Sequence, residues 1–157
     1  MGMDFTLYWL RKNEDNLDTM SWKELEAHTL CYARKGWELV YYLDASVDEL
    51  YTPLKKETWD SLITAMAPVG PQLKEIWDAF HMYYNTDDDF DEFAKWEPEK
   101  AKLMKKYQYW YDSTFERNPS LGYAFSVSYM IDFWEARDKV KTYLGDPNYE
   151  VIMEVSQ

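Results

Sequence analysis

Apolar and polar residues alternate at both ends of the chain, and this alternation predicts two β-strands. In residues 3–10, Phe5, Leu7 and Trp9 fall on one face at a period of two, and the residues between them take the other face. Residues 149–155 alternate in the same way, with glutamates between apolar positions. We expect these two terminal strands to form a small sheet.

Apolar residues spaced three and four positions apart predict helices through the middle of the chain. Such stripes cover residues 59–66, 73–84, 103–111 and 133–144. Residues 68–71, which contain two prolines and a glycine, end the first of these helices. Pro98 suits the first turn of the third helix, and Gly145 suits the C-terminal cap of the last one.

The segment after the first strand allows two interpretations. Ser21, with Glu24 three residues later, matches a capping box and predicts that a helix begins there. The apolar stripe continues through Gly36. A glycine inside a helix costs about 1 kcal/mol relative to alanine, and packing along the whole helix face can outweigh this cost. We therefore favour one long helix over residues 21–43. The alternative is that Gly36 ends the helix and that residues 37–43 form a strand.

Two further segments are read from local patterns. Ser46 and Glu49 form a second match to the capping box, followed by a short segment that reaches Pro53. Residues 122–130 alternate well enough for a strand, although they can also extend the following helix. Together the patterns predict an α+β fold, mainly helical, in which residues 1–157 form a single domain.

The composition predicts a folded core that needs neither disulfide bonds nor a structural metal ion. The chain has 157 residues, of which 46% are hydrophobic and 18% aromatic, whereas disordered chains lack such aromatic content. Cys31 is the one cysteine, so no disulfide can form within the chain. No secretory signal or long apolar run is evident, which predicts a cytoplasmic protein without a membrane span.

Several classes of catalytic and cofactor site are missing from the sequence. With 5 glycines in the chain, neither a phosphate-binding loop nor a dinucleotide fingerprint occurs. His28 and His81 are too few and too scattered to indicate a zinc site. On a helix His28 could lie beside Cys31, but a small thiol next to an apolar stripe is usually packing. We predict no catalytic residues, no metal and no cofactor.

The formal net charge is −12, from 29 acidic and 17 basic residues. Such a chain repels nucleic acids and anionic membranes, because both are bound largely through lysine and arginine. A basic protein surface would be attracted, and complementary charge accelerates association. An alternative is that the acidity serves only solubility.

Between residues 85 and 99 the chain becomes sharply acidic. Five acidic residues near its start are candidate binding residues: Asp87, Asp88, Asp89, Asp91 and Glu92. Asp87, Asp89 and Asp91 fit positions 1, 3 and 5 of a calcium-binding EF-hand loop. Glu92 then replaces the required glycine, and Pro98 replaces the bidentate glutamate. The calcium loop fails, and a solvated acidic loop is the interpretation that remains.

A second candidate site begins at Tyr32, where Arg34 and Lys35 place two cations together in an acidic chain. Arg34 could bind a carboxylate or a phosphate through both its terminal nitrogens, with Tyr32 or Trp37 alongside. The alternative is that both cations pair with nearby glutamates or face water.

The same residues carry a resemblance. The chain resembles a family of small, uncharacterised phage and bacterial proteins that open Met-Gly-Leu-Asp-Met-Tyr-Leu and carry a helix reading Tyr-Trp-Arg-Lys. Residues 1–7 read Met-Gly-Met-Asp-Phe-Thr-Leu, and Tyr32, Arg34 and Lys35 match the helix motif, with Ala33 in place of tryptophan. The resemblance covers about forty N-terminal residues. It implies the long helix and a phage or prophage setting, and it supplies no activity.

Three function classes follow from these observations. The first is a non-enzymatic accessory factor that binds or inhibits a basic host protein, such as a nuclease, through an acidic and aromatic surface. The second is a small-molecule-binding protein or enzyme with a pocket near Tyr32, Arg34 and Lys35. The third is a structural protein that associates with itself. The sequence does not fix the oligomeric state.

Overall fold

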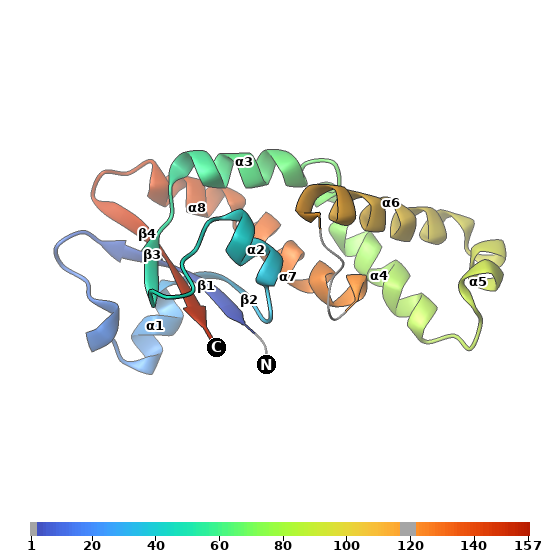
Figure 1. The fold of residues 1–157 in the computed structure, drawn as a ribbon, viewed down its shortest axis with the longest axis horizontal. Coiled ribbons are helices and arrows are strands. Elements are labelled where there is room, and N and C mark those ends of the chain that lie inside the picture. Colours follow the sequence, from blue (N-terminus) through green and yellow to red (C-terminus); the bar gives the residue numbers. More distant parts are fainter. Residues whose placement is uncertain (1–2, 117–121) are drawn as a thin grey trace. The chain divides into compact units, whose positions relative to one another are not determined.

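The computed structural model describes residues 3–116 and 122–157 of the chain, and within them it shows an α+β fold rich in helix (Figure 1). Four strands form one antiparallel sheet in the order β2-β1-β4-β3. These strands are β1 (Asp4–Arg11), β2 (Thr29–Ala33), β3 (Tyr51–Pro53) and β4 (Tyr149–Ser156). The expected sheet of N- and C-terminal strands is confirmed, since β1 and β4 pair along their whole length.

Eight α-helices lie within the described residues. They are α1 (Trp22–His28), α2 (Trp37–Tyr42), α3 (Lys56–Met66), α4 (Leu73–Tyr84), α5 (Phe90–Trp96), α6 (Pro98–Phe115), α7 (Tyr123–Glu135) and α8 (Arg137–Leu144). Two single-turn 3-10 helices, η1 (Leu17–Thr19) and η2 (Gly70–Gln72), complete the element order. The helices expected over residues 59–66, 73–84 and 103–111 are confirmed by α3, α4 and α6, whereas the stripe of residues 133–144 is divided at Ala136 between α7 and α8. Pro98 stands in the first turn of α6, and Gly145 is the C-cap of α8.

The chain divides into two compact units. Unit 1 comprises residues 1–64 and 132–157, and unit 2 comprises residues 65–131, so the divisions fall within α3 and α7. Unit 1 contains the whole sheet, and unit 2 is helical. The expectation that residues 1–157 act as a single domain stays a prediction.

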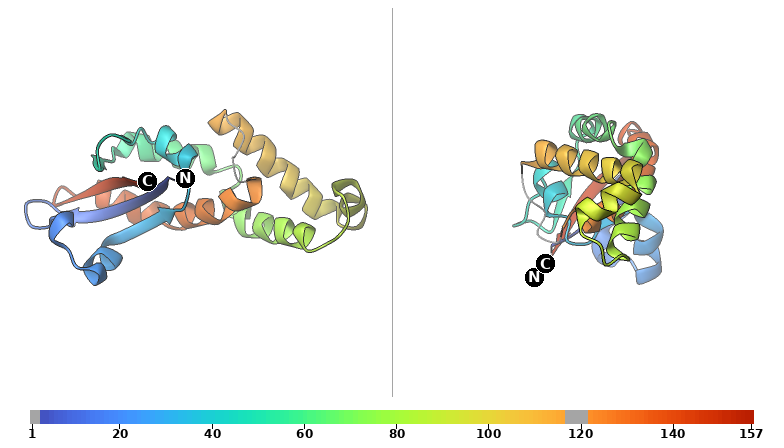
Figure 2. Two further views of the ribbon diagram at one scale, coloured as in Figure 1. Left: turned by 60° about the horizontal axis from the view of Figure 1, so that its bottom comes forward. Right: turned by 90° about the vertical axis from the view of Figure 1, so that its right-hand side faces the viewer.

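In unit 1, both faces of the sheet are covered. On one face Phe5 stacks on Phe133 of α7 at 5.9 Å between ring centroids, and Trp9 stacks on Tyr143 of α8 at 5.1 Å. The segment from η1 to α1 covers the other face, where Leu17 packs with Tyr8. Figure 1 shows α3 and α8 together on one side of the sheet, and Figures 1 and 2 show α1 on the side opposite α3.

Unit 2 is held by aromatic packing between helices. Phe80 of α4 meets Tyr107 of α6 edge to face at 6.1 Å, and both side chains are buried. The Trp110 indole donates a hydrogen bond of 2.7 Å to the carbonyl oxygen of Ala65. Phe93 of α5 is buried and lies 5.3 Å from Tyr83, which fixes α5 against the end of α4.

The long helix predicted for residues 21–43 is wrong. Its first part is confirmed, because the Ser21 hydroxyl accepts from the backbone N–H of Glu24 and α1 begins at the next residue. The chain then leaves the helix at Thr29, because residues 29–33 pair with β1 as an edge strand. The alternative, a strand over residues 37–43, is also wrong, because Trp37–Tyr42 form helix α2.

The two remaining local predictions have different outcomes. The Ser46 hydroxyl accepts from the backbone N–H groups of Asp48 and Glu49, as a capping serine would, but no helix follows it before β3. In residues 122–130, helix α7 begins at Tyr123, so the helical alternative holds there.

Candidate binding surfaces

The predicted site around Tyr32 is organised by Asp4. The Tyr32 hydroxyl donates to one carboxylate oxygen of Asp4 at 2.8 Å, and the backbone N–H of Lys35 donates to the other at 3.1 Å. Lys35 has a φ of 57°, in the left-handed region, where the chain turns from β2 toward α2. Partial burial and the bond to Asp4 raise the pKa of Tyr32. Tyr32 and Lys35 are therefore brought together by internal contacts.

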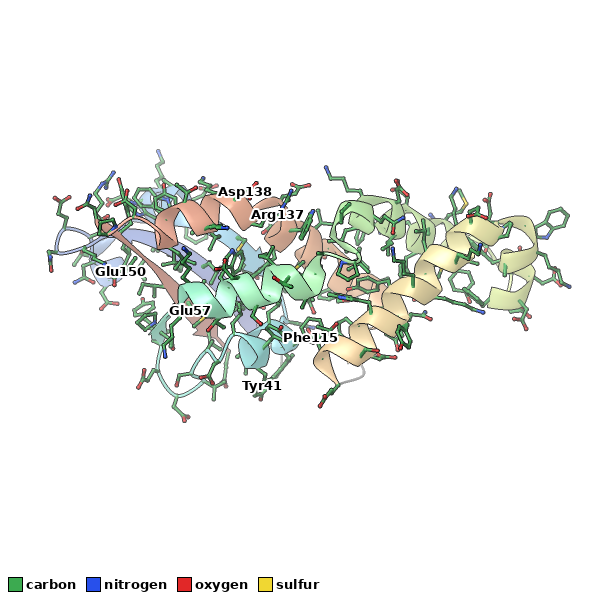
Figure 3. All side chains as sticks on the ribbon, turned by 90° about the horizontal axis from the view of Figure 1, so that it is seen from above. Tyr41, Glu57, Phe115, Arg137, Asp138 and Glu150 are labelled. Carbon is green, nitrogen blue, oxygen red and sulfur yellow. The ribbon has the colours of Figure 1, made fainter. Side chains whose placement is uncertain are left out.

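The other two members of this site point to different surroundings. Arg34 is exposed, and Trp37 is half-buried and stacks on Tyr41 at 6.2 Å. Tyr41 is 55% exposed and projects from α2 (Figure 3). The backbone N–H of Tyr32 donates to an Asp132 carboxylate oxygen at 2.9 Å, which satisfies a donor on the outer edge of β2. In this segment Arg34 is an exposed cation, and Trp37 and Tyr41 form a stacked aromatic pair.

His28 and Cys31 are placed by packing. His28 stacks on Trp9 at 3.8 Å, and its Nδ1 lies 2.7 Å from the Trp9 carbonyl oxygen. Cys31 is buried in β2, and burial raises the pKa of its thiol well above the usual range. A thiol that stays protonated is a poor nucleophile. This arrangement gives no support to cysteine–histidine chemistry.

The five acidic candidates of unit 2 are all exposed. Asp87 and Asp88 lie in the turn after α4, and Asp89 caps α5 by accepting from the backbone N–H of Glu92 at 2.9 Å. Glu92 lies 3.5 Å from Lys95, an exposed ion pair worth little in water. The expected acidic loop thus contains a short helix, α5. The acidic side chains near its N-terminal end stabilise it, because that end of a helix carries a partial positive charge.

Large aromatic side chains are exposed at both ends of this acidic segment. Trp96, the last residue of α5, is 76% exposed, and Tyr84, the last residue of α4, is 62% exposed. Between them, Tyr83 packs on both Phe90 and Phe93, which holds the two helix ends together. We call the surface formed by Tyr84, Trp96 and the five acidic candidates the acidic-aromatic surface.

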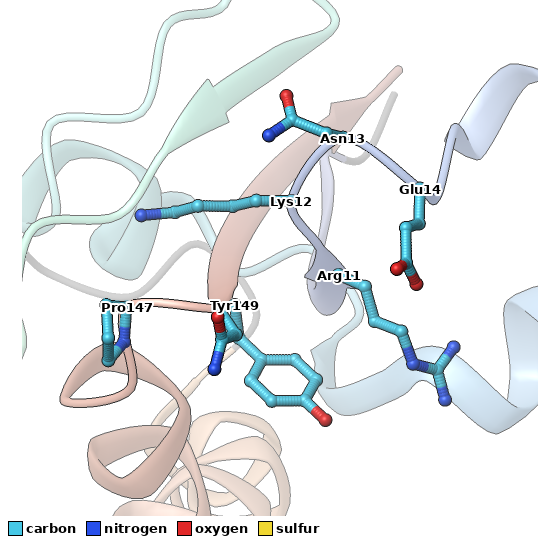
Figure 4. A pocket seen from close by; sticks show the side chains of 7 residues that line it. Arg11, Lys12, Asn13, Glu14, Pro147 and Tyr149 are labelled. Atoms are coloured by element: carbon cyan, nitrogen blue, oxygen red, sulfur yellow. The ribbon is translucent and has the colours of Figure 1, made fainter.

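A polar cavity of about 370 Å³ lies in unit 1 between two turns (Figure 4). Arg11, Lys12, Asn13 and Glu14 line it from the turn after β1, and residues 147–149 line it from the turn before β4. Figure 4 shows the Arg11 and Lys12 side chains extending in different directions. Arg11 lies over the Trp9 ring at 5.1 Å. The two cations therefore do not converge on one anion.

A second cavity of unit 1, of about 290 Å³, lies on the sheet face that η1 covers. Seven residues line it: Leu10, Asp15, Asn16, Leu17, Asp18, Tyr51 and Ile152. Leu10, Leu17 and Ile152 are buried and belong to one hydrophobic cluster, which forms an apolar floor. The Tyr51 hydroxyl donates to an Asp18 carboxylate oxygen at 3.3 Å at the rim. We call this site the η1 cavity.

Neither cavity was among the sites predicted from the sequence. The η1 cavity combines the end of β1, the turn around η1, β3 and β4, which are brought together only by strand pairing. One available signal was the Asn16-Leu17-Asp18 turn, because the Asn16 side chain accepts from the backbone N–H of Asp18 at 3.0 Å. A buried leucine between polar turn residues marks a turn that folds back onto the core.

None of the helices in residues 3–116 and 122–157 combines the length and apolar character needed to cross a membrane. Over the same ranges, no three histidine, cysteine, aspartate or glutamate side chains are grouped so that they could hold a metal ion.

Comparison of the chain with known proteins finds no matching family model, no matching curated protein and no matching solved structure.

Proposed function

We propose that this chain is a non-enzymatic binding protein, an accessory factor of phage type, that engages a basic host protein such as a nuclease through its acidic-aromatic surface. The observation that carries the proposal is the exposure of five carboxylates within six consecutive residues, next to Trp96, which is 76% exposed. The phage setting rests on the sequence resemblance alone.

The charge of the chain is concentrated in this segment. Residues 85–99 hold seven acidic residues and one lysine, a net charge of −6, which is half of the formal −12 of the whole chain. A field of one sign over a small area attracts a basic partner and can raise association rates by about 10- to 1,000-fold. The segment therefore supplies the steering that the proposal requires.

The exposed aromatic residues would supply the affinity. Tryptophan, tyrosine and arginine dominate the few interface residues that carry most of the binding energy. Trp96 and Tyr84 keep most of their surface in water, where burial against a partner would be favourable. Where a basic partner carries arginine, the guanidinium can also pack on these aromatic faces.

The alternative pocket near Tyr32, Arg34 and Lys35 has less support. Tyr32 and the backbone of Lys35 are bound to Asp4, and neither cavity described above is lined by these residues. Exposed Arg34 remains as a single polar group, whereas small-molecule sites combine a concave apolar wall with several convergent polar groups.

The test begins with capture of host proteins on the immobilised full-length chain, followed by rate measurements with the purified partner. A triple variant, Asp87→Asn, Asp88→Asn and Asp91→Asn, removes three charges and leaves the Asp89 cap in place. We expect its association rate to fall on the order of 10-fold at low salt. Trp96→Ala should weaken binding by about 30-fold, mainly through faster dissociation.

A matched control removes the same charge elsewhere. Glu26, Glu49 and Glu57 are exposed residues of unit 1, and their triple change to glutamine should leave the association rate nearly unaltered. An equal loss in both triple variants would show attraction by total charge only and would overturn the proposal. Failure to bind any basic host protein would do the same.

A further inference from the structure

We infer that the η1 cavity is a binding site for a small organic ammonium ion, a protonated primary amine on a short apolar stem. The inference is independent of the proposed function, because the cavity belongs to unit 1 and the acidic-aromatic surface to unit 2. Three features of the cavity carry it: an apolar floor, an acidic rim and an aromatic wall.

The floor suits the apolar stem. Leu10, Leu17 and Ile152 are each no more than 7% exposed and pack with Tyr8, and partly buried Met20 and Leu25 extend the cluster. Since one water molecule occupies about 30 Å³ in the liquid, a cavity of about 290 Å³ holds a chain of a few methylene groups rather than a large ligand. It lies at the lower end of the usual volumes of ligand pockets.

The rim suits the ammonium group. One oxygen of Asp15 accepts from the backbone N–H of Arg11 at 2.8 Å and from its guanidinium at 3.5 Å, so the Arg11 cation is already engaged. Asp18 accepts from the Tyr51 hydroxyl and has no ion pair within the described part of the chain. Its second carboxylate oxygen can therefore accept from an ammonium ion, while a carboxylate or phosphate ligand would be repelled.

The surroundings strengthen the negative potential at this face. Glu154 lies opposite Tyr51 in the β3–β4 register and is half-buried, with the Tyr8 hydroxyl 3.3 Å from it. Burial raises the pKa of Glu154, and no described residue forms an ion pair with this carboxylate. The Tyr51 ring adds a face to which a cation is attracted. A positively charged ligand would thus gain from Asp18, from Glu154 and from the Tyr51 ring at once.

The experiment titrates the full-length chain with ethylamine, butylamine and hexylamine at pH 7, followed by calorimetry and by NMR shifts of residues 15–18. We expect affinity to rise about fourfold for each methylene until the cavity is filled. Hexanoate and 1-hexanol, which share the stem but lack the positive charge, should bind at least 10-fold more weakly than hexylamine.

Two variants separate the site from general charge attraction. Asp18→Asn keeps an acceptor for the Tyr51 hydroxyl and should weaken hexylamine binding by about 10-fold. Asp48→Asn, at another exposed acidic residue of unit 1, should change nothing. The inference is overturned if the affinity for the amines does not increase with chain length, or if hexanoate binds as tightly as hexylamine. It is also overturned if Asp18→Asn and Asp48→Asn bind hexylamine equally well. None of these results bears on the acidic-aromatic surface.

Discussion

Replacing Gly36 with alanine distinguishes the observed fold from the long helix that the sequence suggests. Gly36 is buried and is the N-cap of α2, just after the β2 strand. A Cβ added there would lie 2.7 Å from the Cβ of Ala33, whereas carbon atoms in contact are normally about 3.5–4.0 Å apart. Ala33 is fully buried, and its Cβ is fixed to the backbone, so it cannot rotate away.

The magnitude follows from this overlap of about 1 Å. Added atoms in a packed core cost about 1–3 kcal/mol, and the lower entropy of the unfolded alanine variant offsets about 0.4–1 kcal/mol of that cost. We therefore expect Gly36→Ala to lower the free energy of unfolding by about 1–2 kcal/mol. In a continuous helix over residues 21–43 the same change would raise it by about 1 kcal/mol. The two structures predict opposite signs.

Urea unfolding followed by circular dichroism measures this difference, with Gly145→Ala as the control. A Cβ at Gly145 would meet the carbonyl oxygen of Lys141 at 3.4 Å, and its φ of −87° suits any residue, so the control should be neutral or slightly stabilising. Adding Ala33→Gly to Gly36→Ala should remove the clash and show a favourable coupling of about 1 kcal/mol. Stabilisation by Gly36→Ala alone would refute the reasoning.

Two further predictions concern a half-buried carboxyl group and a helix cap. Burial raises the folded-state pKa of Glu154 above 4.5, so the folded state binds its proton more tightly and wild-type stability falls as pH rises through that raised value. Glu154→Gln, which keeps an acceptor for the Tyr8 hydroxyl, should match wild type below pH 4 and exceed it at pH 7 in urea melts. Ser21→Ala should lower stability by about 1 kcal/mol in thermal melts, because it removes the cap of α1. Ser46→Ala should cost less, because no helix follows that serine.

The strands and helices that the sequence predicted correctly are those whose local pattern agrees with their packing. Residues 73–84 carry an apolar stripe, and the same stripe is buried in α4. Residues 149–155 alternate, and they pair with β1 as a central strand. In both segments the side chains that share a face by periodicity also meet the core, so local and tertiary preferences agree.

The helix predicted through residues 29–43 is wrong because tertiary pairing overrides the local pattern. Apolar residues three and four apart continue from α1 into this segment, but Cys31 and Ala33 lie opposite Leu7 and Phe5 in the β1–β2 ladder. Lys35 then adopts a φ of 57°, which few residues other than glycine or asparagine favour. The spacing of apolar residues along the chain predicts neither the pairing of β2 with β1 nor the left-handed backbone conformation of Lys35.

The two candidate binding sites differ in how much of each can be predicted from the sequence. The acidic-aromatic surface is formed by residues 84–96, so a run of acidic residues was enough to indicate most of it. Trp96 lies outside this run of acidic residues, and its exposure depends on its place at the end of α5, a helix that the sequence analysis did not predict. The η1 cavity needs Leu10, Tyr51 and Ile152 together, and their sequence separation leaves no local signal.

The formal charge of −12 overstates what the surface offers to a partner. Asp4 accepts from Tyr32 and from the backbone of Lys35, and Glu154 accepts from Tyr8, so both carboxylates already have internal hydrogen bonds. The acidic candidates of unit 2 are exposed instead, and of these only Asp89 caps a helix. Attraction of a basic protein depends on charges that remain in water until the complex forms. Recognition should therefore follow the charge of residues 85–99 rather than the net charge of the chain.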